Sequence, residues 1–169
     1  MTTNVEKFMH IAGQPATRGV FDTRQTAFQI GMCCEELSET IQSLFQGDTI
    51  GNGIMRELRF FGEQMKAGVY DDCVQRSDKL ELLDGFADVR YVAEGGMAAM
   101  GADVEGAIEA VEMNNLTKFE TCPECGGAGY FREFTCTQCN GNGRIAKRDE
   151  NGKVIKPAGY KKVSLEQFL

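Results

Sequence analysis

The chain has 169 residues, of which 42% are hydrophobic and 25% are charged, as is typical of ordinary globular proteins. This length predicts one domain, or one domain with a small appendage. No apolar run approaches the roughly 18 residues that a transmembrane helix needs. The first residues also lack the basic start and apolar stretch of a signal peptide. The sequence therefore predicts a cytoplasmic protein with no membrane partner.

The net charge of −7 is distributed unevenly. Residues 144–162 carry seven basic and two acidic side chains, a net charge of +5, so the remainder of the chain carries −12. Because an acidic body repels nucleic-acid phosphates, this charge disfavours nucleic acid as a partner. A basic tail beside an acidic body instead predicts a bound anion between them, with cations that compensate the acids.

Helical patterns dominate the first 120 residues. The predicted helices cover residues 4–11, 23–46, 54–66, 79–101 and 104–119. Asp22 and Asp103 stand at the N-cap positions of two of them, where a carboxylate accepts hydrogen bonds from free backbone N–H groups. Residues 47–53 and 67–77 are predicted as connections. Near the C-terminus, Asn151-Gly152 predicts a turn between two extended pieces.

Two of the predicted helices have an apolar stripe at helical spacing. The stripe on the helix over 79–101 consists of Leu82, Phe86, Val89 and Ala93. Both helices should therefore pack into a bundle. The predicted fold class is all-α, a helical bundle with a small C-terminal zinc-binding appendage.

The same two helices carry acidic side chains at spacings that place them on one face. These are Glu35, Glu36 and Glu39 on the first helix, and Glu81, Asp84 and Asp88 on the second. If the two faces meet, the carboxylates need neutralisation, because two like charges about 4 Å apart repel by roughly 4 kcal/mol at an effective dielectric near 20. Oxygen ligands suit Mg²⁺ or Mn²⁺. A solvated acidic helix face is the alternative interpretation.

In these segments the chain resembles the MazG-like and phosphoribosyl-ATP pyrophosphohydrolase-like group of all-α NTP pyrophosphatases. That group pairs an EExxE helix with an ExxD helix, which stand here at residues 35–39 and 81–84. Further matching segments, in the family's order, are VEKFMHIAGQP (5–15), DGFADVRYV (84–92), MNNLTKF (113–119) and NGKVIKPAGY (151–160). The chain departs from the pattern in a long stretch over 47–77 and in a cysteine-rich insertion after residue 119.

The resemblance implies hydrolysis of a (d)NTP to the (d)NMP and pyrophosphate by metal-activated water. It implies Glu36 as the general base or a further metal ligand, and Glu35 and Glu36 can exchange these roles. The implied ligands of Mg²⁺ (or Mn²⁺) are Glu35, Glu39, Glu81 and Asp84. Asp88 would orient a ligand or lie near the helix surface.

On the substrate side, the resemblance implies that phosphate or sugar is bound by Asn115, Lys118 and Lys153. It also implies a homodimer or homotetramer, because members of the group usually assemble their bundles from more than one chain.

A separate motif lies at Cys122, Cys125, Cys136 and Cys139. Two CxxC pairs ten residues apart have the spacing of a four-cysteine structural zinc site. Each pair stands in a CxxCxGxG unit, so the segment resembles half of the cysteine-rich region of DnaJ-type co-chaperones. Because about 20 residues cannot bury a core of their own, zinc binding would fold the segment.

These patterns predict three parts: an NTP pyrophosphatase-like helical domain (1–120), a four-cysteine zinc module (121–145) and a basic tail (146–169) that completes the first domain. The module would have a structural role and hold Lys153 and the tail over the acidic helices. The rival hypothesis is a non-catalytic zinc-containing module that binds nucleic acid or another protein. On that view the module presents aromatic residues such as Tyr130 and Phe134 to the partner.

Overall fold

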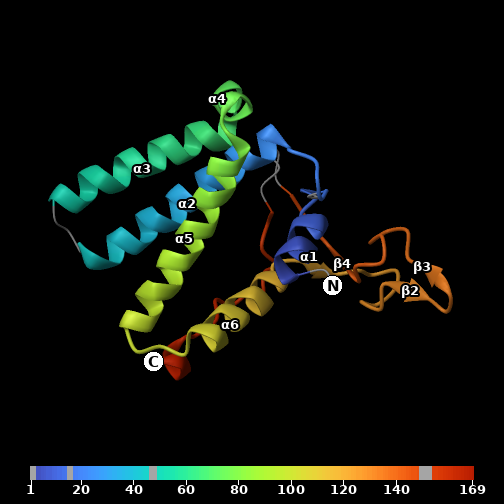
Figure 1. Ribbon diagram of the computed structural model, residues 1–169. Helices are drawn as coiled ribbons and strands as arrows, with labels where there is room; N and C mark the ends of the chain where they lie inside the picture. The colour runs from blue at the N-terminus through green and yellow to red at the C-terminus, as the bar shows by residue number, and fades with distance from the viewer. Residues whose placement is uncertain (1–2, 15–16, 46–48, 149–153) are drawn as a thin grey trace. The chain divides into compact units, whose positions relative to one another are not determined.

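The computed structural model describes residues 3–14, 17–45, 49–148 and 154–169. It is helical apart from a small cysteine-rich segment with short strands (Figure 1). The helices are α1 (Asn4–Ile11), α2 (Thr23–Leu44), α3 (Thr49–Ala67), α4 (Asp71–Arg76), α5 (Lys79–Ala99) and α6 (Val104–Leu116), with a final 3₁₀ turn η1 (Glu166–Phe168). The strands are β1 (Glu120–Thr121), β2 (Tyr130–Phe131), β3 (Phe134–Thr135) and β4 (Arg144–Ile145). The predicted all-α fold class with a small C-terminal cysteine cluster is confirmed.

The predicted N-caps are both present. The Asp22 carboxylate accepts a hydrogen bond from the backbone N–H of Gln25, and the Asp103 carboxylate accepts one from Gly106. These bonds satisfy N–H groups that the first turn of a helix leaves without partners.

Two predicted connections were partly wrong. Helix α3 begins at Thr49, so most of the predicted loop over 47–53 is helical. Gly51, which favoured a loop, is buried where a side chain would collide with Phe45, so tertiary packing overrides its weak helix propensity. Helix α4 lies inside the predicted connection over 67–77.

The chain divides into two compact units, and α5 runs from one into the other. One unit comprises Thr17–Phe86, and the other comprises Met1–Ala16 with Ala87–Leu169. The predicted division into 1–120, 121–145 and 146–169 follows sequence patterns and not compactness, and it stays a prediction.

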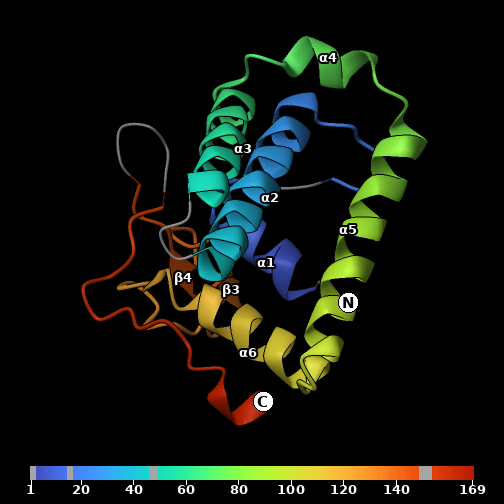
Figure 2. The same ribbon diagram turned by 90° about the vertical axis from the view of Figure 1, so that its left-hand side faces the viewer.

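In the unit over 17–86, α2 and α3 form an antiparallel hairpin (Figures 1 and 2). Its apolar core contains the buried side chains of Ala27, Met65 and Val74. Leu82, near the start of α5, packs against this core and is only partly buried.

The two helices of the hairpin touch through their backbones at Gly31 and Gly62, which are both buried. A Cβ added to Gly31 would lie 2.6 Å from the carbonyl oxygen of Gly62, and one added to Gly62 would lie 2.9 Å from the carbonyl oxygen of Gly31. Both distances are too short for real atoms, so this crossing requires glycine on both helices. The contact sets the register of α3 on α2.

In the other unit, α1 packs on the end of α6 around Phe119, whose ring centroid lies 4.8 Å from that of Phe8. The C-terminal tail follows α6. Tyr160 Oη donates to Asn114 Oδ1 at 2.8 Å, and Asn114 Nδ2 donates to the carbonyl oxygen of Lys161 at 2.8 Å. The predicted extended pieces around residue 150 are paired through Arg148 and Val154, while the turn itself lies outside the described residues.

Helix α5 has no buried residue. The first half of its apolar stripe is partly covered, but Val89 is 55% exposed and Ala93 is exposed as well. The expectation that this helix packs into a bundle along its whole stripe is therefore not met within one chain. In the described part of the chain, no helix has the length and apolar character needed to cross a membrane.

The glycine contact leads to a stability prediction. Gly31→Ala should lower the free energy of unfolding by about 1–2 kcal/mol, because overpacking outweighs the gain in helix propensity. The matched control is Gly53→Ala on α3, where an added Cβ meets nothing within 4 Å. This control should raise stability by up to about 1 kcal/mol. Urea unfolding of both variants measures the difference, and equal effects would contradict the proposed packing.

Candidate functional site

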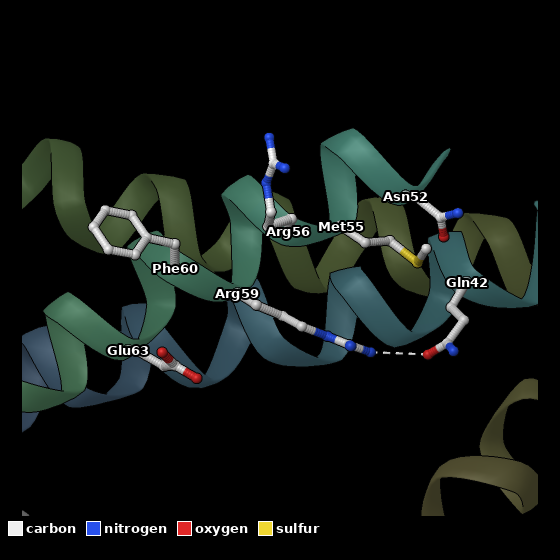
Figure 3. Close-up of a pocket in the computed structure, with 7 residues that line it drawn as sticks. All are labelled: Gln42, Asn52, Met55, Arg56, Arg59, Phe60 and Glu63. Carbon is white, nitrogen blue, oxygen red and sulfur yellow. Dashed lines mark hydrogen bonds between the residues drawn. The ribbon is translucent and has the colours of Figure 1, made fainter. Parts of the chain in front are cut away.

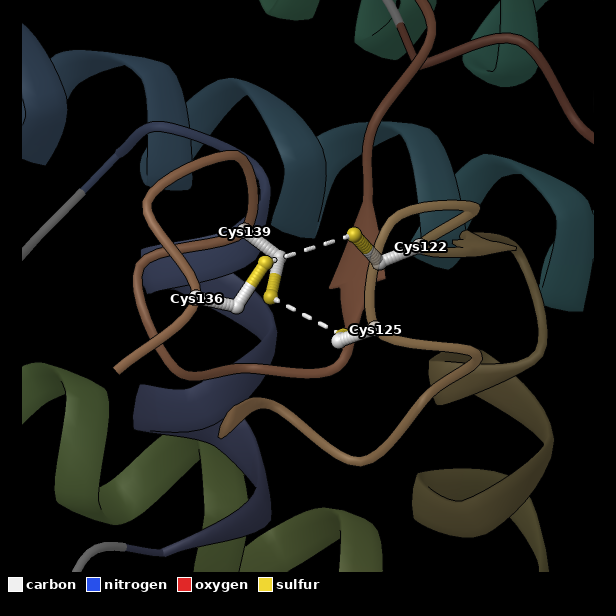
Figure 4. A group of neighbouring side chains, drawn as sticks. All are labelled: Cys122, Cys125, Cys136 and Cys139. Carbon is white, nitrogen blue, oxygen red and sulfur yellow. Dashed lines mark hydrogen bonds between the residues drawn. The ribbon is translucent and has the colours of Figure 1, made fainter. Parts of the chain in front are cut away.

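Four cysteine thiols converge in the segment after α6 (Figure 4). The Sγ atoms of Cys122 and Cys136 lie 3.8 Å apart, and those of Cys125 and Cys139 lie 3.7 Å apart. All four sulfur atoms lie within 4.8 Å of one another. Tetrahedral zinc with Zn–S bonds of about 2.3 Å requires sulfur atoms about 3.8 Å apart. The cluster therefore fits a zinc module.

The backbone around the cluster has the same arrangement in both CxxCxGxG units. The N–H of Gly129 donates to Cys125 Sγ at 3.2 Å, and the N–H of Gly143 donates to Cys139 Sγ at 3.2 Å. Both glycines have positive φ angles, 82° and 70°, which side chains other than glycine rarely adopt. Such N–H···S bonds stabilise a thiolate in a metal site.

The thiols also differ in acidity. Burial raises the pKa of Cys136 to about 12. Burial acts in the same direction on Cys125, but N–H groups of Gly129 and Gly127 and the neighbouring thiols lower the pKa of Cys125 to about 7. Because four negative charges this close repel one another, they ionise together only when a cation is present.

The carboxylates on α2 lie in the unit over 17–86. Glu35 is partly buried and accepts a bond from Lys66 Nζ at 2.6 Å, while Glu36 and Glu39 are exposed. On α5, Glu81 and Asp84 belong to the same unit and are also exposed. Their oxygen atoms are the donor type that Mg²⁺ and Mn²⁺ prefer, and in both helices they are accessible to an ion.

Within one chain these carboxylates do not converge. Among the described residues, the four cysteines form the one group of three or more His, Cys, Asp or Glu side chains whose ligand atoms lie close enough together to bind one ion. From α5, Leu82 packs against the core of the unit over 17–86. In the part of the chain that the structure describes, this contact does not bring the acidic face of α5 onto α2. The assignment of Glu35, Glu39, Glu81 and Asp84 as metal ligands stays a prediction.

Helix α3 brings two cations to α2 that the sequence analysis missed, Lys66 and Arg59. Arg59 Nε donates to Ser38 Oγ at 3.2 Å, and Arg59 Nη2 donates to Gln42 Oε1 at 2.8 Å. Ser38, inside the EExxE segment, is fully buried. Neither cation lies in a motif that carries the resemblance. Only the register of the hairpin places them beside the carboxylates.

Arg59 also borders an open pocket of about 400 Å³ between the two helices (Figure 3). The lining residues are Gln42, Asn52, Met55, Arg56, Arg59, Phe60 and Glu63. Figure 3 shows the Arg59 side chain extended toward Gln42, to which it is hydrogen-bonded. The lining carries two guanidinium groups and the Glu63 carboxylate, and Arg56 is already paired with Glu57.

The predicted substrate-binding residues lie in the other unit. Asn115 is partly buried near the end of α6, and Lys118 Nζ lies 5.9 Å from the ring centroid of Phe8. The neighbouring Asn114 makes the hydrogen bonds to the tail described above, so it has a structural role. Lys153 lies outside the described residues. Asp88 is exposed on α5.

Comparison with known families gives one match. A model described as phosphoribosyl-ATP pyrophosphohydrolase matches residues 3–115, which is well over half of the chain. The match includes both acidic helices and ends before the cysteine-rich segment. No curated protein and no solved structure matches the chain.

The thiol geometry predicts about one zinc ion per chain in protein purified under reducing conditions. Cys136→Ser should lose this ion, because removing one thiolate opens a closed four-thiolate shell. Elemental analysis by mass spectrometry measures the zinc content. The control is Cys73→Ser, an exposed cysteine of α4 outside the cluster, which should keep it. Zinc retained by the Cys136 variant, or absent from the wild type, would contradict the assignment.

Proposed function

Because the chain belongs to the phosphoribosyl-ATP pyrophosphohydrolase family, we propose that it is a divalent-metal-dependent nucleoside triphosphate pyrophosphatase. The proposed reaction is hydrolysis of the α–β phosphoanhydride of a (d)NTP, which yields the (d)NMP and pyrophosphate. The observation that carries the proposal is the family match over both acidic helices, α2 and α5.

In this proposal the carboxylates have two roles, as metal ligands and as the general base. Glu35, Glu39, Glu81 and Asp84 would hold Mg²⁺ or Mn²⁺. When bound, such an ion neutralises phosphate charge and increases the acidity of a water molecule. Glu36 accepts the proton of the attacking water at a carboxylate oxygen, for which its exposed position on α2 is suitable.

The substrate's phosphates or sugar are bound by Asn115, Lys118 and Lys153 in the proposal. A lysine ammonium is a compact positive charge that suits pyrophosphate. The zinc module then has a structural role, because four thiolates leave no open position on the ion for substrate. Thiols that bind zinc must stay reduced, which favours a cytoplasmic location.

A second copy of the chain is part of the proposal. Helix α5 exposes large apolar side chains, including Leu80, Tyr91 and Val92, which are 75%, 77% and 69% exposed. A long helix that leaves the second half of its apolar stripe and its acidic face open is not stable by its own packing. A homodimer or homotetramer would cover this helix and supply the neighbours that the acidic faces lack in one chain.

One observation favours the second candidate function, a binding module. The β2–β3 hairpin exposes Tyr130, Phe131 and Phe134, which are 62%, 46% and 77% exposed. Exposed aromatic residues on a metal-stabilised hairpin suit a protein partner. The net charge of −12 outside residues 144–162 disfavours nucleic acid as that partner.

The activity is tested by pyrophosphate release from a panel of NTPs and dNTPs with Mg²⁺ or Mn²⁺. Glu39→Ala should lower the rate by roughly 100-fold or more, because it removes a ligand of the catalytic ion. The control is Glu57→Ala on α3, an exposed carboxylate whose ion pair is with the adjacent Arg56. It should keep wild-type activity. No release by the metal-loaded wild type from any nucleotide would refute the proposal.

The assembly is tested by analytical ultracentrifugation. The wild type should sediment as a dimer or tetramer of the 18.6 kDa chain. Val89→Glu should shift it toward the monomer, because a charge cannot be buried in an apolar interface without a partner. Arg90→Gln, one residue away and 78% exposed, is the matched control and should leave the assembly unchanged. A monomeric wild type would contradict this part of the proposal.

A further inference from the structure

The ion pair between Lys66 and Glu35 differs from the other ion pairs in the described part of the chain. The Lys66 side chain is 24% exposed and that of Glu35 is 35% exposed, whereas every other basic partner is at least 48% exposed. The Nζ–Oε2 distance of 2.6 Å is short for an ammonium–carboxylate bond. Such a partly buried pair is screened less by solvent and salt than a surface pair.

The close approach of the backbones at Gly31 and Gly62 leaves room for the Lys66 side chain to reach Glu35. Lys66 follows Gly62 by one turn on α3, and Glu35 follows Gly31 by one turn on α2. Because the helices are antiparallel, the lysine side chain must run along α2 to reach the carboxylate. It passes over Gly31, where an added Cβ would lie 2.7 Å from Lys66 Cγ. A side chain at position 31 would block this route, so the contact depends on the glycine crossing.

Carboxylates of α2 and cations of α3 meet around this pair. Three carboxylates, Glu35, Glu36 and Glu39, lie within two turns of α2. The other cation from α3, Arg59, is hydrogen-bonded to the neutral side chains of Ser38 and Gln42. Lys66 therefore supplies the direct positive charge from α3 at the EExxE segment.

From this geometry we infer that Lys66 is a built-in counter-ion that occupies Glu35 until a divalent cation replaces it. The inference rests on the proposed function, in which Glu35 is a metal ligand. An ammonium and a divalent cation are attracted to the same carboxylate oxygen and repel each other, so they compete for it. Lys66 is thus a positioning residue. It orients Glu35 and balances its charge in the metal-free protein, and it lowers the affinity of the site for the ion.

The test measures Mn²⁺ binding to the full-length chain without nucleotide, by the electron paramagnetic resonance signal of free Mn²⁺. Lys66→Gln should bind Mn²⁺ roughly three- to tenfold more tightly than the wild type, because the competing charge is gone. Lys66→Arg keeps the charge and should stay closer to the wild type. In a Glu35→Gln background, Lys66→Gln should have no further effect, because the shared ligand is absent.

Arg56→Gln is the matched control. It removes one positive charge from the same helix, where Arg56 pairs with Glu57 on the surface. It should leave Mn²⁺ affinity unchanged. An equal or weaker Mn²⁺ affinity in Lys66→Gln, with cooperative thermal unfolding retained, would overturn the inference and leave Lys66 a purely structural partner.

A measurement on the wild type keeps the test independent of variant folding. The NMR signal of Lys66 Cε should shift when Mg²⁺ is added, because the ammonium leaves the carboxylate. An unchanged signal at saturating Mg²⁺ overturns the inference. A wild type that binds no Mn²⁺ without nucleotide overturns the counter-ion inference, whereas pyrophosphate release decides the proposed function. If the wild type releases pyrophosphate but Lys66→Gln binds Mn²⁺ with unchanged affinity, only the counter-ion inference is overturned. If Lys66→Gln binds Mn²⁺ more tightly but the wild type releases no pyrophosphate from any nucleotide, only the proposed function is refuted.

Discussion

The backbone contact between Gly31 and Gly62 determines most of what surrounds the EExxE segment. Because the two helices meet there without side chains, α3 has a fixed register on α2. On one side of the crossing, Lys66 runs over Gly31 to Glu35; on the other, Arg59 reaches Ser38 and Gln42. The charge environment of the carboxylates on α2 is thus a consequence of helix packing.

Two clusters of anionic groups in this chain are completed in different ways. The four thiols come from a segment of fewer than twenty residues and are already close enough for one zinc ion. The carboxylates come from two helices, and within one chain they do not share a centre. A local fold can be arranged by one ion, whereas a site between long helices needs those helices to be held by further packing. The open apolar surface of α5 is where we propose that such packing occurs.

Local features could be predicted from the sequence. Asp22 and Asp103 cap helices because a carboxylate before an apolar pattern is a local signal, and the cysteine spacing specified the thiol cluster for the same reason. Features that depend on register could not be predicted. Lys66 and Glu35 pair although they lie far apart in the sequence. Gly51 is helical, although glycine has a low helix propensity, because it packs against Phe45. The exposure of Val89 could not be predicted either, because an apolar periodicity shows which face of a helix is apolar but not whether anything covers it.

In the proposed reaction, water attacks the α–β phosphoanhydride of a nucleoside triphosphate at the carboxylates of α2 and α5. The most direct measurement is hydrolysis in ¹⁸O-water, with the first products followed by ³¹P NMR and mass spectrometry. We expect pyrophosphate and the nucleoside monophosphate as the first products, one of which carries the single ¹⁸O atom from water, and we expect no orthophosphate. Release of orthophosphate with the nucleoside diphosphate would contradict the proposed reaction, because attack would then occur at the terminal phosphorus.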